Sequence, residues 1–170
     1  MEFLELAKKR YAARTYRQQP VEPEKINAVL QAAYVAPTAA NLQPHHIFVI
    51  QKPENLQKLS KAANIYHAPL VFLVCVEESA AWVRPFNRKN HGDIDASIIT
   101  DHMMLEATEQ GLNSVWICYF KPDVICSEFD LPQGCHPVNL LAVGYGAGPV
   151  PSPDRHHETR KPLETIVTWY

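Results

Sequence analysis

Residues 93–118 read DIDASIITDHMMLEATEQGLNSVWIC and combine the longest helical pattern of the chain with a strand that follows directly. Gly111 supplies a C-terminal stop, so the helix is predicted from about Asp93 to Gln110. Its apolar residues form two faces, one with Ile94, Ile98, Leu105 and Leu112 and one with Ile99 and Met103. A helix with two apolar faces is buried on both sides. A dimer interface is favoured as the second partner, and burial inside the chain's own core is the alternative.

The segments on either side supply further helices and strands in irregular alternation. Apolar spacing predicts helices from Glu2 to about Arg10 and from Pro23 to Pro37, and shorter helices open at Pro53 and Pro122. Runs with strand composition cover residues 45–51, 69–76, 113–118 and 137–146, and a β-branched and aromatic run closes the chain at 164–170. The irregular order favours an α+β layered fold over a doubly wound parallel sheet.

Length and composition fit one globular domain that spans residues 1–170. The net charge of −2 gives no basic surplus for nucleic acid, and no apolar run approaches the roughly 20 residues of a membrane helix. The opening MEFLELAKKR lacks a signal-peptide core, and Cys75, Cys118, Cys126 and Cys135 form no CxxC pair. We therefore expect a cytoplasmic protein with reduced thiols and with no nucleic-acid or membrane partner.

Two segments fall outside the regular elements. Residues 77–92 mix aromatic and charged side chains without a helical or strand period, which predicts an excursion of the kind that often lines a site. Residues 146–170 form a C-terminal arm whose first part, up to Pro162, is rich in proline, histidine and charge and lacks periodicity, which predicts an extended arm or, as the alternative, a disordered one. A terminal strand reached by such an arm can pair with the sheet edge of another chain.

Several common catalytic motifs do not occur in the sequence. There is no GxxxxGK[ST] loop, and the glycine cluster at 144–148 runs into a proline instead of opening a helix, which indicates a strand-exit turn. No HExxH motif is present, and the adjacent histidines at 45–46 and 156–157 would point to opposite sides of an extended chain. No metal site is expected. Without a GxSxG elbow or a cysteine signature, any chemistry requires a borrowed cofactor.

Three separated segments carry side chains suited to a flat ligand with a phosphate. Arg10 and Arg14 lie four residues apart after the first helix and can face one anion. Residues 36–44, APTAANLQP, form a loop of small and amide side chains that lets a flat ring approach the backbone. Arg160 and Lys161 precede the terminal strand and can close on the same phosphate.

These segments resemble the motifs of the nitroreductase family of flavoproteins, and the resemblance spans nearly the whole chain. The family's R-R-S-x-R motif resembles residues 10–14, and its A-P-S-x-x-N-x-Q-P motif is similar to residues 36–44. Its D-x-x-A and L-x-A-x-x-x-G-L-x-x-x-W-I patterns resemble the stretch from Asp95 to Ile117, and its R-K-P-L-E ending matches residues 160–164. The loop motif is the most specific of the four.

The resemblance implies a layered fold whose central, mainly antiparallel sheet is flanked by helices and whose C-terminal strand is exchanged with a partner subunit. It also implies a homodimer that binds flavin mononucleotide (FMN), with residues 37–41 of one subunit against the ring held by the other. The residues implied in cofactor binding are Arg10, Tyr11, Ala12, Arg14, Pro37, Thr38, Ala39, Asn41, Ile117, Cys118, Arg160 and Lys161. Tyr11 and Ala12 depart from the motif's arginine and serine, which implies weaker flavin binding, and Cys118 stands where the family usually has glycine.

The resemblance further implies an enzyme in which FMN carries the chemistry and no side chain acts as a catalytic group. Electrons would pass from NADH or NADPH to a small organic acceptor, such as a nitroaromatic compound or a quinone, in a ping-pong mechanism. Trp82, Arg84 and Phe86, with Arg88 nearby, are candidates for substrate contact. The alternatives are a non-catalytic or regulatory flavin-binding dimer, a flavin-fragmenting or dehalogenating relative, and a cofactor-free interaction domain.

Overall fold

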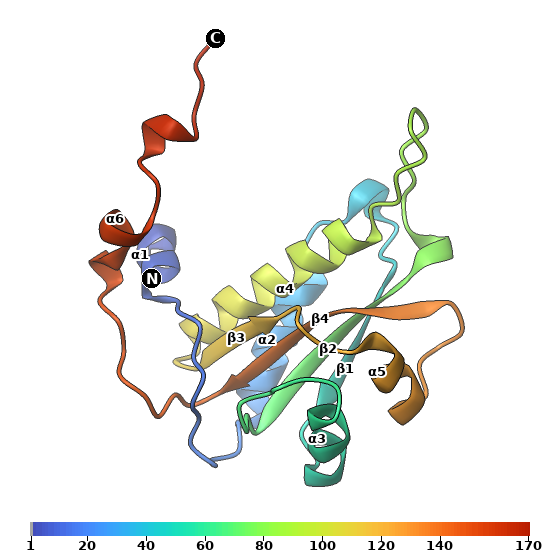
Figure 1. Ribbon diagram of the computed structural model, residues 1–170, viewed down its shortest axis with the longest axis horizontal. Helices are drawn as coiled ribbons and strands as arrows, with labels where there is room; N and C mark the ends of the chain where they lie inside the picture. Colours follow the sequence, from blue (N-terminus) through green and yellow to red (C-terminus); the bar gives the residue numbers. More distant parts are fainter. Residues whose placement is uncertain (1) are drawn as a thin grey trace.

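The computed structural model describes residues 2–170 and places helices on both faces of a four-stranded sheet (Figure 1). The strands are β1 (His45–Ile50), β2 (Leu70–Glu77), β3 (Asn113–Ile117) and β4 (Cys135–Gly144). They lie in the order β1-β2-β4-β3, and every neighbouring pair is antiparallel. The predicted α+β fold with a central antiparallel sheet is confirmed.

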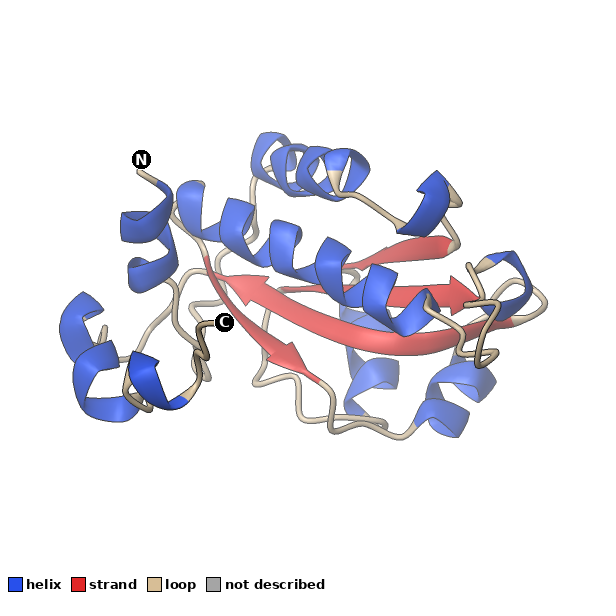
Figure 2. Ribbon diagram, turned by 90° about the horizontal axis from the view of Figure 1, so that it is seen from above, coloured by secondary structure: helices blue, strands red, loops and turns tan. Residues whose placement is uncertain are grey.

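Two helical layers enclose this sheet. The helices are α1 (Phe3–Lys9), α2 (Pro23–Val35), α3 (Pro53–Ser60), α4 (Gly92–Glu109), α5 (Pro122–Glu128) and α6 (His156–Thr159). Helices α2 and α4 cover one face of the sheet, and α3 and α5 cover the other (Figure 2). The helix starts predicted at Pro23, Pro53 and Pro122 are confirmed, because each proline occupies the first helical position. Among residues 2–170, no helix is both long and apolar enough to cross a membrane.

Strand β2 shows why the sheet needs a layer on each face. All of its residues except Glu77 are buried. Successive side chains of a strand point to opposite faces, so the strand contributes to two cores. Val71, Leu73 and Cys75 pack under α3 and α5, and Leu70, Phe72, Val74 and Val76 pack under α2 and α4.

Helix α4 has one fully buried face and one that is only partly covered. Ile99 and Met103 belong to the core under α2 and α4, as expected for one of the two predicted apolar faces. On the other face Ile94 is 40% exposed, and Ile98 and Leu105 are half-buried. Leu112 does not continue that face: it follows the end of the helix and turns into the core. The single chain therefore leaves an apolar strip of α4 without full cover.

The segment between α1 and α2 runs along the edge of the sheet. Ala12 forms a parallel bridge with Ser114 of β3, and Tyr16 forms an antiparallel bridge with Gly146. The buried hydroxyl of Tyr16 donates to two backbone carbonyl oxygens, at 2.9 and 3.2 Å. A Cβ at Gly146 would lie only 3.0 Å from the hydroxyl of Tyr11. The glycine cluster thus follows the strand exit, as predicted, and also lets the segment carrying Arg10 and Arg14 lie close to the sheet.

The C-terminal arm differs from the prediction in two respects. Before Pro162 it is not simply extended, because it forms a 3-10 turn, η3 (Pro153–Arg155), and then α6, both near α1 (Figure 1). The strand predicted at 164–170 is wrong for the single chain, in which only a 3-10 turn, η4 (Leu163–Thr165), interrupts an irregular tail. Strand composition yields a strand only beside a sheet edge, and this tail points away from the chain's own sheet.

Most of the excursion at 77–92 lies outside the core, as predicted, although Ala81 is buried in the core under α2 and α4. It contains a 3-10 turn, η2 (Glu78–Ala80), and a narrow hairpin closed by a bridge between Val83 and Asn90. The hairpin projects beyond the sheet (Figure 1), and Phe86 near its tip is 96% exposed. It therefore presents aromatic and basic side chains to solvent at the N-terminal end of α4.

Candidate functional site

An arginine-lined cavity of about 410 Å³ joins the two ends of the chain. Its walls come from the segment after α1 and from the C-terminal arm, and they consist of Arg10, Tyr11, Ala12, Arg14, Pro151, Arg155, His156, Thr159 and Arg160. No acidic side chain is among these lining residues, so the cavity concentrates positive charge that suits a phosphate. Lys161, predicted beside Arg160, is exposed and is not among them.

The arginine side chains of this cavity lie close enough for their positive charges to repel one another. Partial burial lowers the pKa of Arg10, and the nearby charges of Arg155 and Arg160 lower it further, whereas Asp101 acts in the opposite direction. An arginine keeps its proton in proteins, so the repulsion remains in the folded chain. A bound anion would relieve it.

Arg155 was not predicted as a site residue, yet its side chain lines the cavity and links its two walls. Its guanidinium donates to the carbonyl oxygens of Lys8 (3.0 Å), Arg10 (2.6 Å) and Ser152 (2.8 Å). The carbonyls at a helix C-terminus lack partners within the helix, and a basic side chain satisfies them. Arg155 thereby fastens the C-terminal arm to the end of α1. No local pattern in the sequence marks this contact, because the partners at the end of α1 are backbone groups about 145 residues away.

Replacing Arg155 by alanine is expected to detach the C-terminal arm from α1 and so to separate the two walls of the cavity. Each net hydrogen bond contributes about 1 kcal/mol, so the arm should open far more often than in the wild type. Limited proteolysis should then cleave residues 150–162 faster. The matched control is His157→Ala, which removes an exposed side chain from α6, the short helix that directly follows Arg155. Equal cleavage rates for wild type and Arg155→Ala would contradict this role.

The loop predicted at 36–44 is tightly wound and lies at the N-terminal end of α4. The backbone N–H of Ala39 donates to Asp95 Oδ1 at 2.9 Å, and Gln43 N–H donates to Thr38 Oγ1 at 3.1 Å. Ala40, Asn41 and Gln43 all have positive φ, at 51°, 55° and 53°. The loop thus presents Pro37, Thr38, Ala39 and Asn41 in a fixed but strained conformation.

The structure does not bring this loop and the arginine cavity together within one chain. The loop is tied to Asp95, whereas Arg10 shares a second cavity with Asp101, Met104 and Leu105. At 1.5 Å per helical residue, the positions of Asp95 and Leu105 are about 15 Å apart along the axis of α4. The two groups of predicted residues therefore lie toward opposite ends of one helix.

The end of β3 supplies the third predicted group. Ile117 is buried, whereas Cys118 and Tyr119 are exposed. The buried Asn139 links this strand to α4: its Oδ1 accepts from Trp116 Nε1 at 2.8 Å, and its Nδ2 donates to Thr100 Oγ1 at 3.2 Å. Cys118 Sγ lies 3.8 Å from the same oxygen. An open cavity of about 550 Å³ runs beside Trp116 along the partly covered face of α4.

The candidate substrate residues lie beside the loop end of α4 and not at the arginine cavity. Trp82 packs edge-on against His91, with ring centroids 4.9 Å apart, at the base of the hairpin. Arg84 N–H donates to Lys89 O at 2.9 Å, which closes the hairpin through its backbone. Phe86 and Arg88 are exposed.

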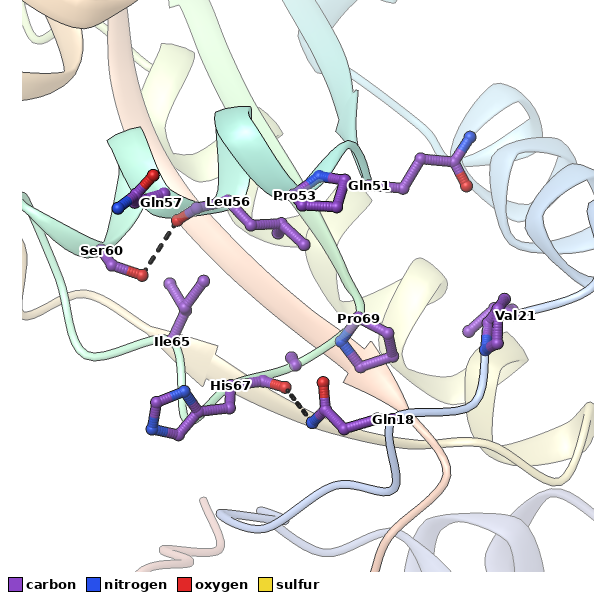
Figure 3. Close-up of a pocket in the computed structure, with 12 residues that line it drawn as sticks. Gln18, Val21, Gln51, Pro53, Leu56, Gln57, Ser60, Ile65, His67 and Pro69 are labelled. Carbon is purple, nitrogen blue, oxygen red and sulfur yellow. Dashed lines mark hydrogen bonds between the residues drawn. The ribbon is translucent and has the colours of Figure 1, made fainter.

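A further cavity, of about 520 Å³, lies beside α3 (Figure 3). It is lined by α3 together with residues from 18–21 and 65–69, and Gln18 Nε2 donates to the carbonyl oxygen of His67 at 3.1 Å across its rim. None of the predicted site residues lines it. Among residues 2–170, no group of three or more His, Cys, Asp or Glu side chains could hold a metal ion.

His45, which follows the loop, makes stability depend on pH. Burial lowers its pKa from the ordinary 6.5, the neighbouring His46 adds to this, and Asp95 opposes it. The unfolded chain then binds the proton more tightly, so this contribution to stability is complete above pH 6.5 and is lost as pH falls through the lower, folded-state value. Thermal unfolding between about pH 8 and pH 5 should show a smaller decline for His45→Gln than for the wild type or for the exposed His46→Gln. Equal declines in all three would contradict this.

Comparison with known proteins identifies the family to which this fold belongs. The fold and the meeting of the two chain ends define an α+β protein with an arginine-lined cavity, and the profile described as the nitroreductase family matches residues 7–65 and 57–145. The chain belongs to the nitroreductase family. A solved nitroreductase family protein from Clostridium difficile 630 is 54% identical, with a TM-score of 0.97 over 99% of this chain and 98% of that one.

Two more distant proteins are similar to this chain over most of its length. An NADH dehydrogenase from Thermus thermophilus is 26% identical over a match that covers 96% of this chain and 93% of the relative. A structure from Exiguobacterium sibiricum, solved in complex with FMN, is 21% identical and has a TM-score of 0.85 over 100% of this chain and 98% of that one. At that identity the second similarity shows a shared fold.

Proposed function

We propose that this protein is an FMN-dependent oxidoreductase that transfers electrons from NADH or NADPH to a small organic acceptor. The observation that carries the proposal is the cavity in which Arg10, Arg14 and Arg160 meet without an acidic lining residue. The phosphate of FMN is an anion that this cavity suits, with arginines giving forked contacts. The names of the Thermus thermophilus relative and of the FMN complex support the same choice.

We propose that the working form is a homodimer, because the ring site needs both ends of α4. A two-fold axis that sets two α4 helices antiparallel would bring the 37–41 loop of one subunit toward the arginine cavity of the other. The partly covered strip with Ile94, Ile98 and Leu105 is a suitable contact surface. The exposed apolar tail at 163–170 would then pack on a sheet edge or groove of the partner, as the predicted strand exchange requires.

Within this arrangement the residues of the chain would bind the flavin, orient its ring and shield it from water. FMN, when bound, would supply the redox chemistry by taking electrons from the nicotinamide and passing them to the acceptor. Arg10, Arg14 and Arg160 would hold its phosphate, and Arg14 would also favour negative charge on the ring. Backbone groups near Ile117 and Cys118 would meet the ring edge, and the small side chains of Thr38 and Ala39 would leave room for its face. Trp82, Arg84 and Phe86 would contact the acceptor.

The test is reduction of the flavin-loaded protein under anaerobic conditions. NADH or NADPH should bleach the visible absorbance of the bound flavin, and a quinone or a nitroaromatic compound should restore it. Steady-state rates with varied donor and acceptor should give the parallel-line pattern of a ping-pong mechanism. Bound flavin that neither nicotinamide can bleach would contradict the proposal and favour a non-catalytic flavin-binding dimer.

A further inference from the structure

Asp95 stands apart from the other charged residues of α4 because it is almost entirely buried, with 2% of its surface exposed. Its Oδ1 accepts the hydrogen bond from Ala39 N–H at 2.9 Å. Its Oδ2 is also buried and has no hydrogen-bond partner within the described part of the chain. A carboxylate held in this way is costly, and an apolar side chain of similar size would suit the core better. The cost indicates that the carboxylate serves something other than packing.

The loop that Asp95 holds does not adopt its shape without constraint. Ala40, Asn41 and Gln43 have φ between 51° and 55°, a region that side chains with a Cβ rarely adopt. The turn has internal hydrogen bonds, from Asn41 N–H to Thr38 O at 3.0 Å and from Leu42 N–H to Ala39 O at 3.2 Å. These bonds lie within the turn, so they do not fix its position, and they break whenever the strained turn opens.

Within residues 2–170, three hydrogen bonds tie the loop to the rest of the fold. At its start, Ala36 N–H donates to Ala33 O at 3.2 Å and only continues the end of α2. Near its end, Glu77 N–H donates to Pro44 O at 2.8 Å, which continues the pairing of β1 with β2. Between them, Ala39 N–H donates to Asp95, and this bond joins the turn itself to α4. The acceptor carries a charge and is out of contact with water, and both conditions strengthen a hydrogen bond.

We propose that Asp95 is a positioning residue for flavin: its carboxylate clamps the Ala39 amide and thereby holds Thr38, Ala39 and Asn41 in the shape that receives the ring bound by the partner subunit. The inference rests on the proposed function for the identity of the ligand. The clamp itself is a property of the protein without cofactor and can be measured without it. Asp95 contacts no reacting atom in this account and acts through the loop.

The first test measures the clamp in the protein freed of flavin. Hydrogen exchange at the amides of Asn41, Leu42 and Gln43 should become about ten-fold faster in Asp95→Ala, because the turn can then leave its strained conformation. Asp95→Asn keeps an oxygen acceptor for Ala39 N–H and should restore most of the protection. The matched control is Asp123→Ala, which removes an exposed carboxylate from the first turn of α5 and should leave these amides unchanged.

A second variant removes the same bond from the other side and does not alter the core. Ala39→Pro deletes the donor, and Thr38 already has the extended backbone, φ −127° and ψ 157°, that a following proline requires. It should speed exchange at the same amides as strongly as Asp95→Ala. The double variant should be no worse than either single variant, since both remove one interaction.

The readout with cofactor is the dissociation constant for FMN. Asp95→Ala should raise it about ten-fold, with Asp95→Asn close to the wild type. Unchanged exchange in both Asp95→Ala and Ala39→Pro would overturn the clamp, and so would an Asn variant that behaves like the Ala variant. Faster exchange with an unchanged FMN dissociation constant would overturn the link to flavin. A wild-type protein that takes up no FMN would instead refute the proposed function, and the exchange data would still decide the clamp.

Discussion

Replacing Arg14 by alanine is expected to raise the dissociation constant for FMN by about ten- to one-hundred-fold, the usual effect of removing a hydrogen bond to a charged group. Arg14 is exposed, lines the arginine cavity and lies opposite the arm that carries Arg160. Its side chain is not part of either core cluster. The variant should therefore fold and unfold like the wild type while it binds flavin poorly. Fluorescence titration with FMN measures the effect.

A neighbouring arginine provides the control for Arg14. Arg17 is also exposed, lies on the same segment, and is not among the residues that line the cavity. Arg17→Ala removes the same charge from the chain and should change the FMN dissociation constant little. Arg14→Lys should give an intermediate value, because lysine retains the charge but not the forked geometry. Comparable losses at Arg14 and Arg17 would show that net charge, and not the cavity, attracts the flavin.

Ending the chain after Pro162 is expected to convert a dimer into a monomer and to abolish tight FMN binding. The removed residues include Leu163, Ile166, Trp169 and Tyr170, which are 69%, 64%, 91% and 117% exposed in the single chain. So much apolar surface on one short tail marks an interaction segment. The truncated chain keeps Arg10, Arg14 and Arg160, so a loss of flavin would come from the lost partner. Sedimentation velocity and FMN titration on the same samples test both parts.

Phe86→Ser is the matched control for the truncation. Phe86 is as exposed as Trp169 but lies near the tip of the hairpin, away from the C-terminal arm. Its replacement should leave the oligomeric state unchanged. A truncated protein that remains a dimer and binds FMN normally would contradict the role proposed for the tail.

The sequence predicted those parts of the fold that depend on local pattern. The apolar run of β2 and the apolar spacing along α4 mark these elements locally, and the starts of α2, α3 and α5 follow from proline at the first helical position. The strand predicted at 164–170 does not form in the single chain, because composition describes what a strand needs and not which edge it meets. Pairing of that kind depends on a second sheet edge, which local sequence does not specify.

The candidate site was predicted unevenly for the same reason. Charge and position, and then the family motifs, selected Arg10, Arg14 and Arg160, and the structure brings these three together from both ends of the chain. Arg155 was not predicted because its partners are backbone carbonyl groups, which every residue carries. Asp95 entered the sequence analysis only as the first residue of the D-x-x-A pattern. Its proposed role in positioning the loop depends on the strained φ angles of residues about 55 positions away. Neither role has a periodic signature.

Native mass spectrometry of the full chain over a dilution series, with and without added FMN, tests the central claim most directly. The account predicts a dimer that carries two FMN molecules, and dilution to the monomer should release the flavin at the same concentration. A monomer that retains one FMN with undiminished affinity would contradict the claim that two copies of the chain form each ring site.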